Sequence, residues 1–221
     1  MVQNRQNQEE FKTMNIKKCK LCKKFGEKFF TRGNKCSSSK CGALKTPARG
    51  KSGGKGKRKK QLSEYGAQLN EKQKMKIVYL LREKQFKNYV LKAASKKRVD
   101  PSEHLMQLLE TRLDNAVYRL GFAVSRGAAK QIVGHGHMLV NDKKVDIPSY
   151  GLKTGDKISI KENSKNKKVF GDLDITLKKY NPPAWLELNK EKKEGKVVSN
   201  PGLEENEYKI NTTAIIEFYM K

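Results

Sequence analysis

The stretch RLDNAVYRLGFAVSRGAAKQIVGHGHMLVNDKKV, residues 112–145, contains the local signals that decide how this chain folds. Its first part continues an apolar stripe with helical spacing, and Gly121 ends that stripe as glycine commonly ends a helix. Ser125 is a good N-cap for a second, short helix that runs to Val133, with Gly134 as its stop. The stretch therefore predicts two consecutive helices before its final segment.

That final segment has the pattern of a β-hairpin. Residues 138–140 and 143–147 are rich in strand-forming side chains, and Asn141-Asp142 between them tolerates the positive φ of a tight turn. A further strand, KISI at 157–160, follows a turn that contains glycine. We therefore expect a helix–helix–hairpin module over residues 111–165.

Helical periodicity also fills residues 63–110. Asp100, Pro101 and Glu103 have the order of an N-cap, a first helical residue and a capping-box acid, so a helix restarts there. The apolar residues at three- and four-residue spacing are Tyr65, Leu69, Met75, Val78, Leu81, Phe86, Tyr89, Val90 and Ala93, then Leu105, Leu108, Leu109, Leu113, Ala116, Val117 and Leu120. We predict a helical domain of several helices, whose last apolar stripe runs unbroken into the module.

The C-terminal residues 166–221 give weaker signals. A polar loop is expected at 162–168 and a short helix at 170–180, and the single tryptophan, Trp185, follows two prolines. The last run, TTAIIEFYM at 212–220, is β-branched and aromatic, which favours a strand. Such a strand needs an earlier partner, because an unpaired edge would be exposed.

The positive charge of the chain is large and uneven. The chain has 49 Lys and Arg against 23 Asp and Glu, a formal net charge of +26. Residues 1–98 hold 29 of the basic and 6 of the acidic side chains, whereas residues 99–221 hold 20 and 17. So large a charge indicates a polyanionic partner. Residues 43–62 are expected to be a basic linker that orders on this partner, and residues 1–17 a disordered tail.

Nucleic acid fits this charge better than a membrane surface does. The basic residues lie among glycines and polar residues, without the opposing apolar stripe of an interfacial helix. No stretch approaches the roughly 20 apolar residues of a membrane-spanning helix, and the N-terminus has no secretory apolar core. We therefore expect a protein that is not exported and that binds folded RNA by its shape, through phosphates and 2′-hydroxyls.

The predicted RNA-binding residues are expected to form a concave basic surface, which the basic linker extends. The short helix should turn its basic face outward, because Ala129, Ile132 and Val133 already face the core. For any single arginine a local ion pair is the alternative, for instance Arg112 with Asp114. The set is Arg49, Lys57, Arg58, Lys59, Lys60, Arg112, Arg119, Ser125, Arg126, Lys130, Gln131, His135, Lys143 and Lys144.

The four cysteines all lie in residues 18–42, as Cys19-x2-Cys22 and Cys36-x4-Cys41. Two close pairs separated by a loop can bring four thiolates to one tetrahedral Zn²⁺ ion. Disulfides are disfavoured without export, and a redox or iron–sulfur role fits the wider x4 spacing less well. Both stay open as alternatives, and a zinc module held by one structural Zn²⁺ is the expectation.

Several motifs resemble one ribosomal family. RLDNAVYRLGFA, SR with Ala129 three residues on, and GHGHMLVN resemble the RNA-binding module named after the fourth protein of the small ribosomal subunit. EKQKMK at 71–76, REKQFKNY at 82–89, DIPSYGLKTGD at 146–156 and the terminal IIEFYMK extend the resemblance to the bacterial family of that protein, over roughly residues 18–221. The cysteine spacing is similar to that of the zinc-containing members.

The resemblance implies both a fold and a function. The fold is α/β (α+β): a zinc-bearing, mainly helical N-terminal domain is completed by the C-terminal segments, and the RNA-binding module is inserted between them. The function is that of a primary rRNA-binding protein of the small subunit, on cytoplasmic or organellar ribosomes, which nucleates assembly of the 5′ domain and contributes to accurate translation. The implied partners are ribosomal RNA, the fifth small-subunit protein and nearby messenger RNA.

Three other functions are weaker alternatives. Related modules occur in pseudouridine synthases and in a tyrosyl-tRNA synthetase, but the residues after 165 contain no recognisable catalytic motif, so we do not expect an enzyme. A zinc-containing DNA-binding regulator would need a recognition helix framed by the cysteines. A stand-alone regulator that binds structured RNA, or an accessory protein of RNA modification, is the remaining alternative.

Overall fold

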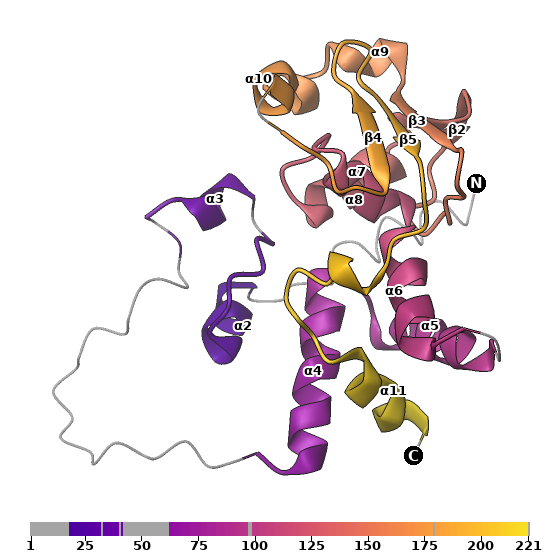
Figure 1. The fold of residues 1–221 in the computed structure, drawn as a ribbon. Coiled ribbons are helices and arrows are strands. Elements are labelled where there is room, and N and C mark those ends of the chain that lie inside the picture. The colour runs from indigo at the N-terminus through magenta and orange to yellow at the C-terminus, as the bar shows by residue number, and fades with distance from the viewer. Residues whose placement is uncertain are drawn as a thin grey trace, which may run out of the picture. The chain divides into compact units, whose positions relative to one another are not determined.

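The computed structural model describes residues 18–31, 33–39, 41, 62–96, 99–178 and 180–220. At residues 18–21, 34, 35 and 168 it describes the backbone but not the side chain. The chain divides into two compact units, residues 1–55 and 56–221. Figure 1 labels most of the helices and strands of both units. The predicted tail at 1–17 and nearly all of the predicted linker at 43–62 lie outside the described residues.

The first unit contains two short helices, α2 (Lys18–Phe25) and α3 (Asn34–Ser37). Gly26 has a φ of 73° directly after α2, a conformation that favours glycine at the end of a helix. Phe29 is buried, and its ring meets the ring of Phe25 edge-on with centroids 5.9 Å apart. So small an apolar cluster supplies little stability to this unit by itself.

The second unit begins with three helices, α4 (Glu64–Val78), α5 (Glu83–Ser95) and α6 (Pro101–Glu110), in the region where periodicity predicted them. Asp100 caps α6 as predicted, because its carboxylate accepts hydrogen bonds from two backbone N–H groups of the first turn. Most of the predicted apolar positions are buried, although Tyr65 is exposed. The buried ones on α4, α5 and the turn between them are Met75, Val78, Leu81, Phe86, Val90 and Ala93.

The C-terminal run forms a helix, α11 (Thr212–Met220), so the predicted strand is wrong. The side chain of Asn211 accepts a hydrogen bond from the N–H of Ala214 at 3.0 Å and caps the start of this helix. Ile215 is fully buried, and α11 packs on α4, α5 and α6. Packing against three helices overrides a β propensity that depends strongly on context. The C-terminal segment does complete the helical domain, with a helix in place of the strand.

The apolar stripe that enters the module also belongs to two helices and not to one. α6 ends at Glu110, and α7 (Leu113–Arg119) begins after an extended Arg112, whose φ is −65° and ψ 138°. The N–H of Leu113 donates to the carbonyl of Tyr150 at 2.9 Å, so a neighbouring loop takes a backbone group that a continuous helix would use. Apolar residues on both sides of the break are buried, and periodicity alone therefore could not show it.

Next to α7 lies α8 (Arg126–Gly134). The hydroxyl of Ser125 accepts a hydrogen bond from the N–H of Ala128 at 3.2 Å, which confirms the predicted cap. The turn after the helix comes at Gly136, with a φ of 69°, later than the predicted stop at Gly134. The three residues predicted to face the core are buried: Ala129, Ile132 and Val133.

A five-stranded antiparallel sheet completes the module, in the order β2–β1–β3–β5–β4. The predicted hairpin is confirmed, and its turn residues Asn141 and Asp142 have φ of 49° and 62°. β4 and β5 were not predicted. The strands are β1 (Met138–Val140), β2 (Lys143–Val145), β3 (Lys157–Ile160), β4 (Leu186–Asn189) and β5 (Glu194–Val197).

The segment from 166 to 197 therefore joins the module's sheet and core, whereas we expected it to pack back on the helical domain. The predicted helix at 170–180 is α10 (Leu173–Lys178), but the predicted loop at 162–168 contains α9 (Glu162–Lys165). A 3-10 turn, η1 (Lys168–Phe170), lies between them. After β5 the chain returns to α6 through a second such turn, η2 (Leu203–Glu205).

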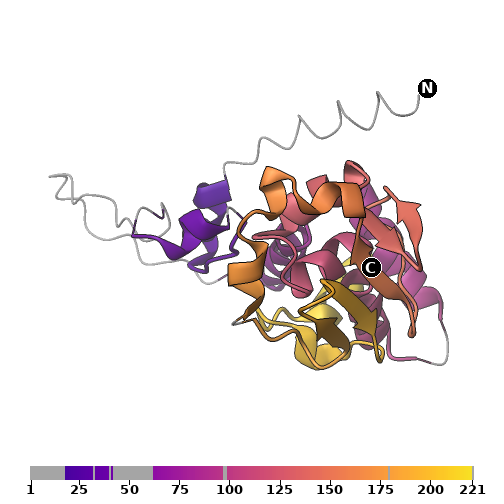
Figure 2. The same cartoon turned by 90° about the horizontal axis from the view of Figure 1, so that it is seen from above.

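One core holds the module together. In Figure 2 the strands lie next to α7 and α8, whose apolar residues share this core with the sheet, α10 and Trp185. Gly195 on β5 lies so close to Leu120 that a Cβ there would come within 2.4 Å of the Leu120 Cδ1 atom. A side chain at this position would therefore separate sheet and helix. None of the described helices has the length and apolar character needed to cross a membrane.

Candidate RNA-binding surface

Six of the predicted RNA-binding residues lie on α8, in the turn after it and on β2. Ser125 caps α8 and so fixes where the helix begins, but it is buried, which corrects its predicted place among the exposed RNA-binding residues. Lys130 is partly exposed on the same helix, and four residues are exposed: Gln131, His135, Lys143 and Lys144. The structure thus brings the predicted basic edge of the module together and turns it to solvent.

Gly136 explains how the hairpin and the helix come into contact. A Cβ built at Gly136 would lie 2.2 Å from the Cε atom of Lys144, so the lysine stem crosses the turn where glycine has no side chain. The ammonium group of Lys144, from β2, is thereby held beside the C-terminal end of α8. The two elements offer their positive charge at one place, as binding to a phosphate backbone requires.

The two histidines that flank this glycine differ. His135 is exposed, whereas His137 is buried and its Nδ1 atom lies 3.1 Å from the hydroxyl of Ser164. Burial lowers the pKa of His137, and the positive charges of Lys167 and Lys161 and the neighbouring His135 lower it further. His137 is therefore held neutral in the packing between the turn and α9, and only His135 can reach a ligand.

Arg112 is buried, which corrects its predicted place on the exposed surface. Its Nε and Nη2 atoms donate to the two carboxylate oxygens of Asp114 at 3.0 and 2.6 Å, and Nη1 donates to the hydroxyl of Tyr89 at 2.7 Å. Burial alone would lower the pKa of Arg112, but the Asp114 carboxylate raises it. The local ion pair that sequence offered as the alternative is the observed arrangement.

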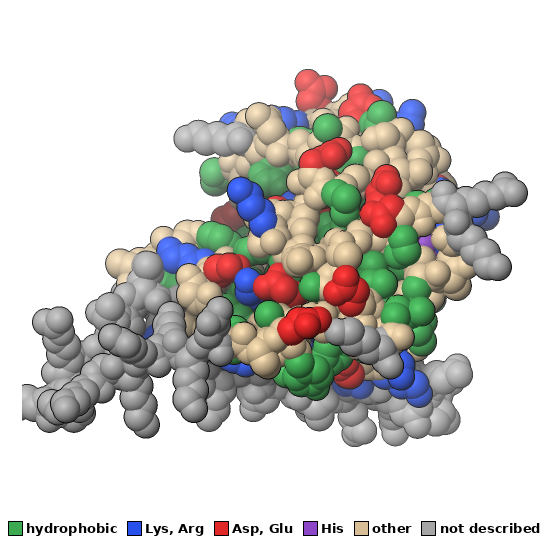
Figure 3. Space-filling view, turned by 60° about the horizontal axis from the view of Figure 1, so that its bottom comes forward, with side chains coloured by type: hydrophobic (Ala, Val, Ile, Leu, Met, Phe, Trp, Pro, Cys, Tyr) green, Lys and Arg blue, Asp and Glu red, His purple; other side chains and the backbone are tan. Residues whose placement is uncertain are grey.

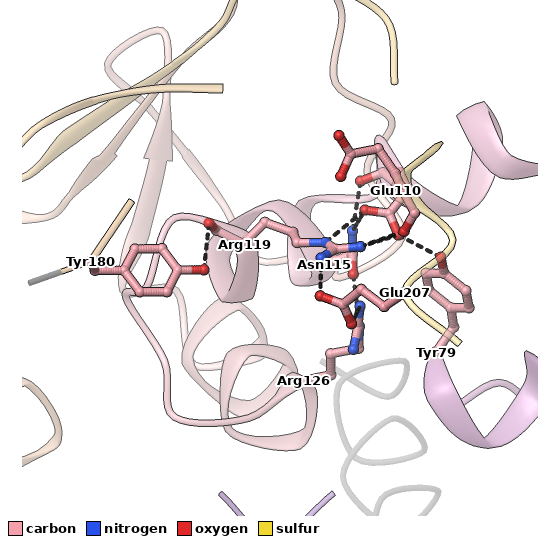
Figure 4. Close-up of polar contacts among 8 residues, drawn as sticks. Tyr79, Glu110, Asn115, Arg119, Arg126, Tyr180 and Glu207 are labelled. Atoms are coloured by element: carbon pink, nitrogen blue, oxygen red, sulfur yellow. Dashed lines mark hydrogen bonds and ion pairs between the residues drawn. The ribbon is translucent and has the colours of Figure 1, made fainter. Parts of the chain in front are cut away.

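Arg119 is buried as well, in a charge network that Figure 4 shows. It donates to both carboxylate oxygens of Glu110, at 2.9 and 3.0 Å, and Glu110 itself is fully buried. The Glu110 oxygens also accept from the hydroxyl of Tyr79 at 2.5 Å and from the side-chain amide of Asn115 at 2.8 Å. This carboxylate is surrounded by donors, as an anion withdrawn from water must be.

Arg126, the first residue of α8, turns inward to the same network. Its Nε atom donates to the side-chain oxygen of Asn115 at 2.8 Å, and its guanidinium lies over the Tyr118 ring, 4.5 Å from the centroid. Glu207 forms ion pairs with both Arg119 and Arg126. Arg112, Arg119 and Arg126, the three described arginines that the sequence assigned to RNA, thus bind carboxylates of the chain itself. These carboxylates satisfy charges that would otherwise be buried unpaired.

The network gives the second unit an acid-sensitive stability. Burial alone would raise the pKa of Glu110, but the charge and hydrogen bonds of Arg119 lower it below the ordinary value of 4.5. A carboxylate with a lowered folded-state pKa stabilises the fold above its unfolded-state pKa, and this contribution is lost as the pH falls. We expect the free energy of unfolding to decrease as the pH falls from about 5 towards 3. Urea unfolding at several pH values measures this, and Glu110→Gln should flatten the profile.

Lys196 is a basic surface residue that sequence reasoning missed, because it lies on the unpredicted strand β5. It is exposed, and the sheet register places it opposite Lys157 on β3 and opposite Glu187 on β4. Lys157 also forms an ion pair with Glu194 at 2.9 Å. The outer face of the sheet therefore has mixed charge, unlike the basic edge formed by α8 and β2. The alternation of the charged Glu194 and Lys196 with Gly195 and Val197 was the available sequence signal for this strand.

The positive charge does not cover every face. Figure 3 shows a face on which acidic side chains lie among hydrophobic and basic ones. Glu64 and Glu204 are exposed acidic residues of the second unit, and the exposed Glu83 pairs with Lys72 and Lys76. Acidic side chains repel a phosphate backbone. The RNA surface is therefore expected on the edge of the module and not on this one.

Comparison with known proteins finds two family domains along this chain, an N-terminal one followed by an RNA-binding module, in the order that the fold shows. Residues 14–110 match the family model of the ribosomal protein S4/S9 N-terminal domain, and residues 111–158 match that of the S4 domain. A small ribosomal subunit protein uS4 from Halothermothrix orenii is 44% identical over 203 residues, which cover 92% of this chain and 96% of the relative. The chain belongs to the uS4 family.

Further uS4 relatives agree with this assignment. The uS4 protein of Acetivibrio thermocellus is 45% identical over 204 residues, and the uS4A protein of Alkaliphilus oremlandii is 46% identical over 204 residues. Each comparison covers 92% of this chain and 96% of the relative. The resemblance found in the motifs is thus confirmed over 92% of the chain.

The cysteines lie within the S4/S9 N-terminal domain of this uS4 chain. Cys22 on α2, Cys36 on α3 and Cys41 are each buried to 6% exposure or less, and none forms a disulfide. The side chain of Cys19 lies outside the described residues, and no group of three metal-ligating side chains gathers among those that are described. Buried, reduced thiols are the donors that Zn²⁺ takes, so the donor chemistry fits, and the zinc site stays a prediction.

The five basic residues predicted in the linker belong to the same uS4 domain match. All of them lie outside the described residues, and their predicted contact with RNA stays a prediction: Arg49, Lys57, Arg58, Lys59 and Lys60.

Proposed function

We propose that this chain is a structural constituent of the small ribosomal subunit and binds its ribosomal RNA. The observation that carries the proposal is the similarity to uS4 proteins over 92% of the chain. The exposed basic edge of α8 and β2 supports it, since structured RNA is bound chiefly through its phosphates and 2′-hydroxyls. Because the family is one of ribosomal proteins, the proposed location of the chain is the bacterial-type ribosome in the cytoplasm.

The finer role that we propose is that of a primary binder of small-subunit RNA. Such a protein nucleates the 5′ domain by offsetting phosphate repulsion where RNA helices converge, and it contributes to accurate translation near the messenger entry. The fifth small-subunit protein is the proposed protein neighbour. Support for this role comes from the family resemblance and from the net charge of +26, which favours early and strong association with RNA.

We also propose that the first unit binds one structural Zn²⁺ through Cys19, Cys22, Cys36 and Cys41. Three of these thiols are buried beside an apolar core of little more than two phenylalanines. Bound zinc would supply the folding free energy that such a core lacks. The lysines that surround the cysteines in the sequence would favour the thiolate form.

A titration with salt tests the RNA-binding proposal. If ten phosphates are neutralised, the logarithm of the association constant for a 5′-domain RNA fragment should fall by roughly 7 to 9 per tenfold rise in salt. The measurement is filter binding of the full chain at four salt concentrations, with duplex DNA as competitor. An affinity that does not change with salt, or an equal affinity for duplex DNA, would contradict the proposal.

A paired substitution locates the contact within the same titration. Lys143→Ala with Lys144→Ala removes two exposed charges from β2, so the salt slope should become shallower by about 2. Lys193→Ala is the control, because Lys193 already pairs with Asp174 at 2.7 Å. Its slope should stay that of the unchanged chain.

A further inference from the structure

The charge network of Glu110, Arg119, Arg126 and Glu207 joins three parts of the second unit that are far apart in the sequence. Glu110 ends α6 of the helical domain, Arg119 ends α7 of the module, and Arg126 begins α8. Glu207 comes from the segment after η2, 88 residues beyond Arg119. The network therefore lies where the RNA-binding module, the helical domain and the returning C-terminal segment meet (Figure 4).

The network is charge-balanced and each of its charged groups has a partner within it, as expected where elements are held in fixed positions. Two carboxylates face two guanidiniums, and Arg119 uses one more donor on the backbone carbonyl of Glu205 at 2.9 Å. On the other side, the hydroxyl of Tyr180, after α10, donates to the backbone carbonyl of Arg119 at 3.0 Å. Burial makes the contacts between Glu110 and Arg119 directional and costly to break.

Glu207 differs from the other members. Its side chain is 40% exposed, and among the described residues it is the only carboxylate that forms ion pairs with both Arg119 and Arg126. It holds the first residue of α8, whose outer face bears the exposed Gln131 and the partly exposed Lys130. A change at Glu207 can therefore act on the position of α8 without opening the buried Glu110 pair.

We propose that Glu207 is a positioning residue that locks α8 to the returning C-terminal segment through Arg119 and Arg126, so that RNA meets the basic edge of the module in a preorganised position. This inference rests on the proposed function. Ordering a mobile α8 on RNA would cost entropy at the moment of binding, and the lock removes that cost in advance. Glu207 needs no contact with RNA for this role.

The direction of the effect separates this role from simple electrostatics. Glu207→Gln removes a negative charge from a basic protein, which by itself strengthens binding to a polyanion. The lock has the opposite consequence: we expect the affinity for the 5′-domain RNA fragment to fall about tenfold. Glu204→Gln is the matched control, because it removes the same charge from an exposed residue of the same segment and should leave the affinity unchanged or slightly higher.

A second measurement tests the lock without RNA. Residual dipolar couplings of the free chain should fit one alignment tensor for α4–α6 and the module together in the unchanged protein and in Glu204→Gln. In Glu207→Gln the couplings of α8 should deviate from that tensor, with unchanged secondary structure. Couplings of α8 that still fit the common tensor in Glu207→Gln, or a rise in its RNA affinity equal to that of the control, would overturn the lock. If the unchanged chain fails to bind the RNA, the proposed function is wrong. The couplings still show whether Glu207 fixes the position of α8.

Discussion

Replacing Glu110 by alanine is expected to lower the free energy of unfolding of the second unit by about 3–5 kcal/mol. Glu110 is fully buried, and its carboxylate is the shared acceptor of Arg119, Tyr79 and Asn115. Removing it leaves the guanidinium of Arg119 and the Tyr79 hydroxyl without their buried acceptor, and each unsatisfied group carries a desolvation penalty. Urea unfolding measures the loss, with the fluorescence of the single, buried Trp185 as the signal.

Two further variants separate a broken pair from a lost side chain. Glu103→Ala removes a glutamate from the same helix, where it only accepts a hydrogen bond from Gln107 at 3.3 Å, and should cost less than about 1 kcal/mol. Glu110→Leu with Arg119→Met replaces the pair by apolar groups and should recover part of the loss, because breaking a buried pair is worse than replacing it. A loss below about 1 kcal/mol for Glu110→Ala would show that water reaches the network or that Arg119 finds another partner, which would contradict the prediction.

The features that sequence predicted correctly are those decided by neighbouring residues. Asp100 and Ser125 cap helices because their side chains reach N–H groups two or three residues ahead. Asn141 and Asp142 form the hairpin turn because both tolerate positive φ. Contacts of this range can be read from a short stretch of sequence, and most of the module followed from them.

The features that sequence missed depend on distant residues. Nothing near Arg119 in the sequence indicates its pairing with Glu207. The prediction that Arg119 faces solvent is wrong because the side chain pairs with Glu207 and Glu110. α11 is a helix because α4, α5 and α6 supply the surface that buries Ile215. From sequence alone, an arginine on a helix is expected to be exposed to solvent. Only the folded structure shows that a distant carboxylate pairs with it in the interior. The missed partners are therefore the parts of the site that hold the RNA-binding edge in place.

Removing Zn²⁺ from the first unit is expected to unfold residues 18–41 while the second unit stays folded. Structural zinc in small modules contributes about 10–16 kcal/mol of apparent binding free energy, far more than the Phe25 and Phe29 contact can supply. The two compact units of the chain explain the independence of the second one. Backbone amide NMR spectra before and after chelation measure this, and metal analysis should give one zinc per chain.

The cysteine series shows whether all four thiols hold the ion. Cys36→Ser should abolish the folded amide signals of the first unit, because a hydroxyl is a poor replacement for thiolate in a structural zinc site. Ser37→Ala changes the exposed neighbour on the same helix and should leave zinc content and spectrum unchanged. With Co²⁺ in place of zinc, the thiolate-to-metal absorption of the unchanged chain should be lost in Cys36→Ser, because this variant no longer holds the ion. A chelated chain that keeps the amide signals of the first unit would mean that buried cysteines and two phenylalanines suffice to hold the fold.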